Sequence, residues 1–409
     1  RHVGSQVTGD GFIQQRGYIE LSVDYNENLH GEIVITDLDP LDVIPDPDAK
    51  SYDPDHWKDV IVTRWMSLDD IELKYGMKAR RRAQDALAAL CDGEEVYIGG
   101  ILEHIEEAGI HSGDSATCIP PFSFSESLQA KLRETTRRIA MALGVRGLVN
   151  VQYAIKGGTV YVIEANPRAS RTVPFISKAT GVPLAKCAAR IMAGDSIASL
   201  GLPSDERQLD WFCMKEAVMP WGRFPGADVI LGPEMKSTGE VMGIAKSYPE
   251  AYAKTQLAID YKLPDPSAGK VFISVCDRDK RHILSVARIL RYLGFDICST
   301  EGTARVLRGG NVTCEVVEKI SGPHDGERPN IGDLIADGKI AVIINTPYGP
   351  GSRGDGYLLR TEAVRRGVTC VTAMSAANTY VSAIEAVRED QQGHGSANDM
   401  GMDAIALQD

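Results

Sequence analysis

Polar residues inside two short apolar runs are the first candidates for chemistry in this chain of 409 residues. Gln152 and Glu164 lie within residues 147–155 and 159–165, two runs that are rich in Val, Ile and Tyr. Such runs, joined here by Lys-Gly-Gly, are typical of the strands of a β-hairpin. Because a buried amide or carboxylate without a partner costs several kcal/mol, each of these two side chains needs one.

The length of the hairpin loop decides whether the two side chains meet. A regular hairpin with a two-residue Gly-Gly loop places Gln152 and Glu164 on opposite faces, because a one-residue shift of register reverses every side chain. A three-residue loop, residues 157–159, instead pairs Gln152 with Glu164. The same register pairs Asn150 with Asn166. The oxygen-rich patch formed in this way suits Mg²⁺, a hard cation that takes oxygen ligands.

Two arginines follow the hairpin directly. The planar guanidinium groups of Arg168 and Arg171 match the oxygens of a phosphate. The hairpin and its arginines therefore predict half of a metal and phosphate site. The alternative from the residues alone is a partly exposed hairpin followed by a solvated loop.

The run VYVIEANPRASRTVPFISKATGVPLAK resembles the metal and phosphate end of the ATP-grasp fold, specifically in the carbamoyl phosphate synthase large chain. The resemblance covers about residues 89–387 and includes GGILEHIEEAGIHSGDSAT and LGPEMKSTGEVMG. It implies an ATP-dependent ligase that uses Mg²⁺ (or Mn²⁺) to phosphorylate carbamate, giving carbamoyl phosphate. The residues it implies are Gln152, Glu164 and Asn166 as metal ligands, His111, Gln152 and Glu164 at the nucleotide, and Arg168, Arg171 and His111 as catalytic residues around the phosphates.

The same resemblance implies partners and effectors. Glu106, Asp114 and Glu216 match acidic residues that contact the effector ornithine in enteric enzymes of the family. Carbamate or bicarbonate and ammonia-derived compounds are the implied substrates, and a small-chain glutamine amidotransferase is the implied protein partner. Pyrimidine and arginine biosynthesis are the implied pathways, and the cytoplasm is the implied location.

After Lys270 the sequence alternates strand-like and helix-like segments, which indicates an α/β fold with a doubly wound parallel sheet. Ligands bind beyond the carboxyl ends of the strands in such a sheet. Small hydroxyl side chains and a Gly before a helix lie there and predict an anion pocket, with simple helix capping as the alternative for the hydroxyls. The residues expected at this pocket are Ser274, Lys280, Thr300, Thr303, Lys319, Asn345 and Thr346.

This last domain resembles the methylglyoxal-synthase-like fold, which is an enzyme in one family and an effector-binding domain in carbamoyl phosphate synthase. The enzyme needs a carboxylate as general base. The stretches NTPYGP and GERPNI lack the aspartates expected there, although Asp333 and Asp355 lie nearby. Regulation by a nucleotide or another phosphate ligand is therefore predicted.

Residues 1–88 resemble a different family, the portal (head-to-tail connector) protein of tailed bacteriophages, through GYIELSVDYNENLHGEIVITDLDPLDVIPDPDAKSYD and VTRWMSLDDIELKYG. We expect an α+β segment with strands at residues 17–25, 31–37 and 59–65. A capping box at Ser67 predicts a helix from Leu68 to about Leu90. The chain is thus an apparent chimera, because no motif of the first part of an ATP-grasp module is recognised before Cys91. We therefore expect this chain by itself to have little or no turnover.

Composition limits the class of protein. A formal net charge of −12 argues against binding to nucleic acid, and no apolar run approaches the ~20 residues that span a bilayer. The eight cysteines form no CxxC pair, which favours reduced thiols. The expected domains are a portal-like segment at 1–88, a partial ATP-grasp domain at 89–202, a connector at 203–268, the methylglyoxal-synthase-like effector domain at 269–388, and a disordered tail at 389–409.

Two other classes of function remain open from the sequence. The first is a catalytically inactive regulatory module whose activity is ligand binding by residues 270–387. The second is a phage portal structural subunit, which rests on residues 1–88 alone.

Overall fold

The computed structural model divides the chain into two compact units, residues 1–77 and 78–409. The described residues are 18–24, 32–38, 43–44 and 61–62, and then 83–394 without 157–158, 204–205, 224–225, 227, 262, 325–326 and 347–352.

The first unit contains two antiparallel strand pairs. Strand β1 (Tyr18–Asp24) pairs with β2 (Glu32–Leu38), and β3 (Val43–Ile44) pairs with β4 (Ile61–Val62). The first two predicted strands are confirmed; of the third, only residues 61–62 lie in the described part, and they form β4. Most of the aspartate-rich segment between β2 and β4, and the capping box at Ser67, lie outside the described residues.

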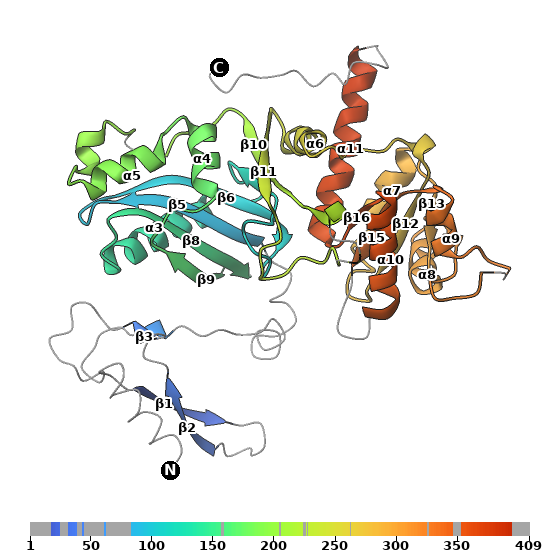
Figure 1. The fold of residues 1–409 in the computed structure, drawn as a ribbon, viewed down its shortest axis with the longest axis horizontal. Coiled ribbons are helices and arrows are strands. Elements are labelled where there is room, and N and C mark those ends of the chain that lie inside the picture. Colours follow the sequence, from blue (N-terminus) through green and yellow to red (C-terminus); the bar gives the residue numbers. More distant parts are fainter. Residues whose placement is uncertain are drawn as a thin grey trace. The chain divides into compact units, whose positions relative to one another are not determined.

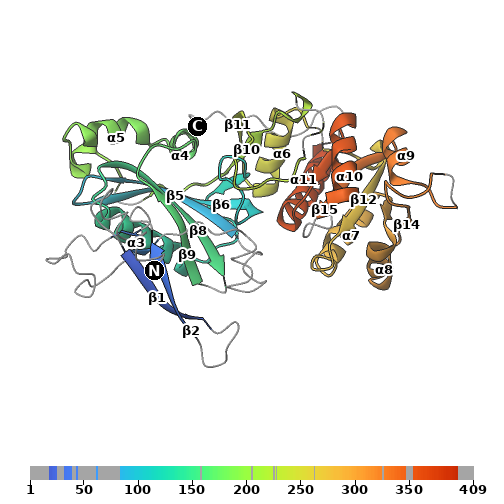
Figure 2. The same cartoon turned by 60° about the horizontal axis from the view of Figure 1, so that its bottom comes forward.

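The second unit begins with an antiparallel seven-stranded sheet in the order β11-β10-β7-β6-β5-β8-β9. Its strands are β5 (Ala83–Cys91), β6 (Val96–Glu107), β7 (Thr117–Ile119), β8 (Gly147–Lys156), β9 (Thr159–Asn166), β10 (Phe212–Val218) and β11 (Gly239–Ala245). Figure 1 shows α4 and α5 over one face of this sheet and α3 over the other, and Figure 2 confirms this arrangement from a second direction.

Strand β5 corrects the helix predicted to run to about Leu90. Its sequence, AQDALAALC, is rich in alanine and leucine, which favour a helix. The strand nevertheless pairs with β6 on one side and β8 on the other, and the side chains from Ala86 to Cys91 are fully buried. Burial in the middle of a sheet therefore overrides local propensity. Residues 68–82 of the predicted helix lie outside the described residues.

The helices over the sheet follow the sequence pattern closely. Helix α3 (Glu126–Ala142) begins after Ser125, whose hydroxyl accepts a hydrogen bond from the backbone N–H of Leu128. Helices α4 (Thr172–Thr180) and α5 (Leu184–Met192) cover the opposite face. The predicted helices at residues 125–143 and 184–192 are confirmed.

The segment expected as a connector contributes to both halves of the second unit. Its strands β10 and β11 complete the seven-stranded sheet at one edge. Its helix α6 (Tyr248–Ala258) opens with a capping box formed by Ser247 and Glu250. Tyr252 of α6 belongs to one apolar cluster with Val271 and Tyr380 of the last domain.

The last domain is a parallel five-stranded sheet in the order β14-β13-β12-β15-β16, with helices on both faces, as predicted. The strands are β12 (Lys270–Val275), β13 (Ile297–Ser299), β14 (Glu315–Val316), β15 (Ile340–Thr346) and β16 (Thr369–Val371). The helices are α7 (Ile283–Tyr292), α8 (Glu301–Gly309), α9 (Ile331–Ala336), α10 (Arg353–Arg366) and α11 (Met374–His394).

Two boundaries in this domain differ from prediction. Helix α7 begins at Ile283 rather than at Asp279, so Lys280 lies in the turn before it. Helix α11 continues to His394, which corrects the disorder predicted from residue 389, while residues 395–409 lie outside the described part. Among the described helices, none combines the length and the apolar character that a membrane crossing needs.

Candidate functional site

The register of the β8–β9 hairpin brings the predicted polar residues together. Gln152 lies opposite Glu164, and Asn150 lies opposite Asn166. The predicted pairs are confirmed, but the predicted reason is wrong. Lys156 pairs with Thr159, so only two residues separate the paired strand ends, and the register shifts by one between Gln152 and Tyr153. Ile163 is the extra residue of a β-bulge, and it restores the pairing that a two-residue loop alone would break.

Hydrogen bonds orient both amide groups of this patch. The side-chain nitrogen of Gln152 donates to Ser112 Oγ at 2.9 Å, and that of Asn166 donates to Glu164 Oε1 at 2.9 Å. Two amide oxygens and one carboxylate form a donor set that fits Mg²⁺ or Mn²⁺.

The two arginines after the hairpin differ in their contacts. Arg168 is exposed, and its guanidinium group donates to the backbone oxygen of Ala169 at 3.2 Å. Arg171 donates through Nη1 to Ser237 Oγ at 3.0 Å, and Ser237 in turn donates to the carbonyl of Gly113 at 3.1 Å. Arg171 is therefore held in place by the chain, whereas Arg168 extends into solvent.

His111 lies in the turn after β6, close to the hairpin. Its ring Nδ1 accepts from the backbone N–H of Gly113 at 3.0 Å. The backbone N–H of His111 donates to the carbonyl of Gly232 at 2.8 Å. The next residue, Ser112, is the hydroxyl that Gln152 contacts. The structure thus brings His111 to the same side of the sheet as the predicted metal ligands.

A buried lysine lies at the centre of the charged residues behind this turn, and the sequence analysis missed it. Lys215 is fully buried and donates through Nζ to the carbonyl of Ser112 at 2.9 Å. Burial lowers the pKa of Lys215, and the nearby carboxylates, with Glu240 and Glu106 foremost, oppose that shift. The only signal in the sequence was its position beside Glu216 in the run MKEAVMP.

Two of the predicted effector residues form a half-buried acidic pair. Burial raises the pKa of Glu106, and the neighbouring Glu216 raises it further. Burial also raises the pKa of Glu216, which accepts from Gln256 at 3.0 Å. The carboxylate of Glu106 accepts from the backbone N–H of Ala116 at 2.7 Å. The cluster therefore favours a shared proton or a bound cation over two free negative charges.

The third predicted effector residue has a different environment. Asp114 is 1% exposed, and its two carboxylate oxygens accept from the backbone N–H groups of Lys236 and Ser237 at 2.8 and 2.9 Å. This carboxylate therefore fixes the chain that reaches Arg171. His104 lies nearby, is 3% exposed, and is kept neutral because burial, and then Lys215, hold its pKa well below the ordinary range.

A second site is the cavity at the carboxyl ends of the parallel strands, with a volume of about 400 Å³. Of the seven predicted residues, five line it: Ser274, Lys280, Thr300, Thr303 and Lys319. Arg328, which the sequence analysis missed, also lines it and forms an ion pair with Glu301 at 2.8 Å.

The hydroxyl group of Thr300 does not cap the helix that follows it. Thr300 is the N-cap residue of α8, but its side chain makes no capping hydrogen bond. Its hydroxyl instead lies 3.2 Å from that of Ser274. Asn345 and Thr346 do not line the cavity; Asn345 donates to the carbonyl of Ser274 at 2.8 Å, and Thr346 accepts from the backbone N–H of Cys276 at 3.3 Å.

The two aspartates that remained candidates for a general base already have partners. The ring of His324 lies 3.0 Å from Asp333, and Lys319 lies 3.4 Å from Asp355. Neither aspartate lines the cavity of this domain. Both contacts agree with a binding role for the domain rather than proton abstraction.

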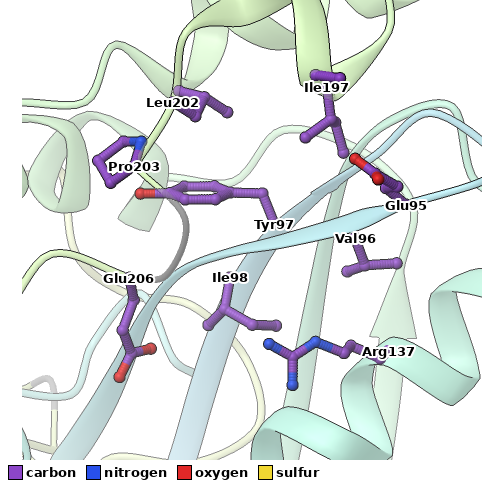
Figure 3. Close-up of a pocket in the computed structure, with 10 residues that line it drawn as sticks. Glu95, Val96, Tyr97, Ile98, Arg137, Ile197, Leu202, Pro203 and Glu206 are labelled. Carbon is purple, nitrogen blue, oxygen red and sulfur yellow. The ribbon is translucent and has the colours of Figure 1, made fainter.

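A second cavity, of about 410 Å³, lies between the start of β6, helix α3 and the segment around Pro203. Figure 3 shows the ring of Tyr97, the guanidinium group of Arg137 and the carboxylate of Glu206 around this space. None of the predicted site residues lines it. In the part of the chain that the structure describes, no group of three or more His, Cys, Asp or Glu side chains is placed to hold a metal, and the predicted metal set holds one carboxylate only.

Comparison with known families defines the class of this protein. The family described as "Carbamoyl-phosphate synthase L chain, ATP binding domain" matches residues 92–200, and the family described as "MGS-like domain" matches residues 282–372. These matches cover the hairpin and the parallel sheet, respectively. The molecule therefore combines an ATP-binding domain of the ATP-grasp kind with an MGS-like domain, as the fold class predicted.

Curated relatives name the family. The chain is 49% identical over 310 residues to the "Carbamoyl phosphate synthase large chain, C-terminal section" of Methanocaldococcus jannaschii, which covers 73% of this chain and 49% of that protein. It is 49% identical over 339 residues to the large chain of Methanothermobacter thermautotrophicus, which covers 78% and 31%. The chain spans half or less of the length of these relatives. Over the matched part it belongs to the carbamoyl phosphate synthase large-chain family and corresponds to its C-terminal part.

Two other comparisons add less. The family described as "Phage P22-like portal protein" matches residues 2–119, and from residue 92 this match overlaps the synthase family, where β6 and β7 belong to the seven-stranded sheet. A solved structure, the biotin carboxylase domain of a single-chain bacterial carboxylase, has a TM-score of 0.36 at 15% identity and covers 44% of this chain and 47% of that one. The assignment does not depend on either.

Proposed function

We propose that this chain carries the metal- and phosphate-binding half of an ATP site that phosphorylates carbamate, together with the effector domain that regulates it. The observation that carries the proposal is the cross-strand pairing of Gln152 with Glu164, which places an amide and a carboxylate on one face beside Asn166. Family membership over about three quarters of the chain supports the same reaction.

The reaction joins carbamate to the terminal phosphoryl group of ATP. A carbamate oxygen attacks the γ-phosphorus, the new O–P bond forms as the bond to the β,γ-bridging oxygen breaks, and carbamoyl phosphate and ADP result. A bound Mg²⁺ or Mn²⁺ supplies the charge that neutralises the phosphate oxygens. The chain's own contribution is positioning, because the transition state of phosphoryl transfer demands fixed charges and donors more than covalent chemistry.

Each predicted residue has a role consistent with its contacts. Gln152, Glu164 and Asn166 hold the metal. Arg171, fixed by Ser237, presents its guanidinium group to a phosphate, and the exposed Arg168 is able to move onto the nucleotide when it binds. The ring of His111, which accepts the backbone N–H of Gly113, contacts the phosphates.

The partners follow from the proposed reaction. Bicarbonate and an ammonia-derived compound are the precursors of carbamate, and a small-chain glutamine amidotransferase supplies the ammonia. The proposed location is the cytoplasm. A phosphate-bearing nucleotide binds the cavity around Thr300, and ornithine binds the acidic pair of Glu106 and Glu216.

The test is metal–nucleotide binding to the whole chain, with Mn²⁺ as the probe. Electron paramagnetic resonance of Mn²⁺ in the presence of ADP measures affinity. Glu164→Ala should weaken binding at least about tenfold, since even residues that only support metal ligands contribute 10–100-fold. Glu126→Ala, whose side chain is 77% exposed on α3, is the matched control and should leave the affinity unchanged. Equal affinity in wild type and Glu164→Ala would contradict the assignment of the metal site.

A catalytically inactive regulatory module is the second candidate, favoured by the cavity of the parallel sheet and its hydroxyl and basic lining. Calorimetry of the whole chain with UMP, IMP and ornithine separates the two functions. Effector binding without any binding of Mn²⁺ and ADP supports the regulatory module. The absence of binding by all three effectors removes its support. A portal subunit requires ring assembly, which electron microscopy detects.

A further inference from the structure

Arg360 is the most deeply buried charged side chain of the last domain, with no exposed surface in the described structure. It lies on α10 and directs its guanidinium group to two partners. Nε and Nη2 donate to the two carboxylate oxygens of Asp228 at 2.6 and 2.7 Å, and Nη1 donates to Asn345 Oδ1 at 2.9 Å. Such a two-pronged contact fixes orientation as well as distance.

Asn345 connects Arg360 to the cavity at the carboxyl ends of the parallel strands, called the effector cavity below. Asn345 is 8% exposed and does not line the cavity, but its amide nitrogen donates to the carbonyl of Ser274 at 2.8 Å. Ser274 does line the cavity, and its hydroxyl lies 3.2 Å from that of Thr300. One side-chain amide therefore separates Arg360 from the cavity wall.

The aspartate side begins a segment, residues 228–237, that belongs to the other half of the unit. Asp228 Oδ1 also accepts from the backbone N–H of Ile230 at 3.2 Å, which forms the first turn of the segment. Lys236, near its other end, donates through Nζ to the carbonyl of Ile230 at 2.7 Å. The two ends of the segment are thus bonded to each other.

The far end of this segment holds the proposed phosphate-binding residues. The carbonyl of Gly232 accepts the N–H of His111 at 2.8 Å, and Ser237 Oγ accepts from Arg171 at 3.0 Å. Asp114 fixes the same end through the backbone N–H groups of Lys236 and Ser237. Every step from the cavity wall to Arg171 is therefore a hydrogen bond or a covalent segment.

We infer that Arg360 is a positioning residue that connects the effector cavity to the phosphate site through Asp228 and residues 228–237. A ligand that shifts Ser274 and Asn345 moves the guanidinium group, and the guanidinium group moves the segment that holds His111 and Arg171. The inference rests on the proposed function, because it joins the two sites proposed above. It adds the residues that carry the signal between them.

A second ion pair between the two halves provides a matched control. Arg278, in the turn after β12, lies 3.7 Å from Glu107 at the end of β6. This pair also joins the last domain to the seven-stranded sheet. Arg278 also donates through Nε to Asp279 at 3.1 Å, and Glu107 lies on β6, outside residues 228–237. Glu107→Gln and Asp228→Asn each remove one negative charge from such a pair.

The experiment measures how UMP changes the affinity of the whole chain for Mn²⁺ and ADP. In wild type, we expect the dissociation constant with saturating UMP to differ severalfold from that without it, within the 5–150-fold range of typical couplings. Asp228→Asn and Arg360→Gln should bring that ratio close to one, while the double variant should do no more than either alone. Glu107→Gln should leave the ratio as in wild type. A lost ratio in Glu107→Gln with a retained ratio in Asp228→Asn would overturn the inference.

Hydrogen exchange provides a readout that needs no ligand. The N–H groups of Lys236 and Ser237 should exchange faster in Arg360→Gln, and equally fast in Asp228→Asn, whereas Glu107→Gln should leave them unchanged. Unchanged exchange of these two N–H groups in both Arg360→Gln and Asp228→Asn would refute the proposed role of Arg360. If wild type binds neither UMP nor Mn²⁺ with ADP, the proposed function fails, and the exchange rates still decide the role of Arg360.

Discussion

The two sheets of the second unit build their polar sites by different means. In the parallel sheet, the ligand-facing residues are the ones that follow strands, so topology alone places Ser274 and Thr300 at one edge. In the antiparallel sheet, the polar residues lie within strands, and a single residue of register decides which face they occupy. The first arrangement lines the site with exposed charged side chains such as Lys319 and Arg328. The second surrounds the fully buried Lys215 with carboxylates, which are half-buried except for the buried Asp114, so its charges contribute to stability as well as to binding.

Removing the buried lysine is the sharpest way to test this difference. Lys215→Met keeps the volume of the side chain but leaves Glu106, Glu216 and Glu240 without their common cation. We expect the free energy of unfolding to fall by about 1–3 kcal/mol, because the buried carbonyl of Ser112 loses its charged donor. Urea denaturation measures the change, with Lys186→Met on the exposed side of α5 as the control. A loss equal to that of the control would remove the distinction between the two sheets.

The acidic pair predicts a dependence of stability on pH. Burial raises the pKa of Glu106 to about 8 and that of Glu216 to about 7, from an ordinary value of 4.5. A folded-state pKa above the unfolded one means that the folded protein binds the proton more tightly. The pair therefore contributes its full stability below about pH 4.5 and loses it as the pH rises to about 8.

Glu106→Gln isolates this contribution, because glutamine resembles the protonated acid. The difference in unfolding free energy between wild type and Glu106→Gln should shift in favour of the variant as the pH rises from about 5 to about 8. Urea titrations across this range measure it. A difference that does not vary with pH would show that the carboxyl group of Glu106 titrates alike in the folded and unfolded chain.

In the cavity of the parallel sheet, a substitution should lower ligand affinity while leaving stability almost unchanged. Thr300→Val removes a hydroxyl that makes no capping bond, so the unfolding free energy should change by no more than about 0.5 kcal/mol. Affinity for UMP, measured by calorimetry, should fall about tenfold or more, because one hydrogen bond to a charged group is worth about 1.5–3 kcal/mol. Thr313→Val, at an exposed position, serves as control. A large loss of stability with unchanged affinity would assign Thr300 a structural role.

The parallel sheet was predicted from the sequence better than the antiparallel sheet. The strands and helices after Lys270 alternate so regularly that the fold and five of the seven cavity residues were predicted. In the antiparallel sheet, the alanine-rich β5 was taken for a helix, since its burial between β6 and β8 depends on residues distant in sequence. No periodic pattern in the sequence marks Lys215 as a buried residue.

The contact between Asp228 and Arg360 shows where such reasoning ends. The two residues are 132 positions apart, and neither lies in a motif that requires the other. Even the correct pairing of Gln152 with Glu164 was reached through the wrong loop length, because a bulge and a longer loop have the same effect on register. The alternation of residues along a strand predicts which side chains share a face of the sheet. It does not predict where a β-bulge interrupts the pairing of two strands.

The bulge at Ile163 also bears on how this hairpin tolerates changes in length. The side chain of Ile163 is 48% exposed, and the residue has no cross-strand partner of its own. Natural relatives that lack this one position would form a continuous ladder and would still place the carboxylate of Glu164 opposite the amide of Gln152. Insertions and deletions along this edge of the sheet can therefore accumulate at a single permissive position, while the spacing from Glu164 to Arg171 stays constant.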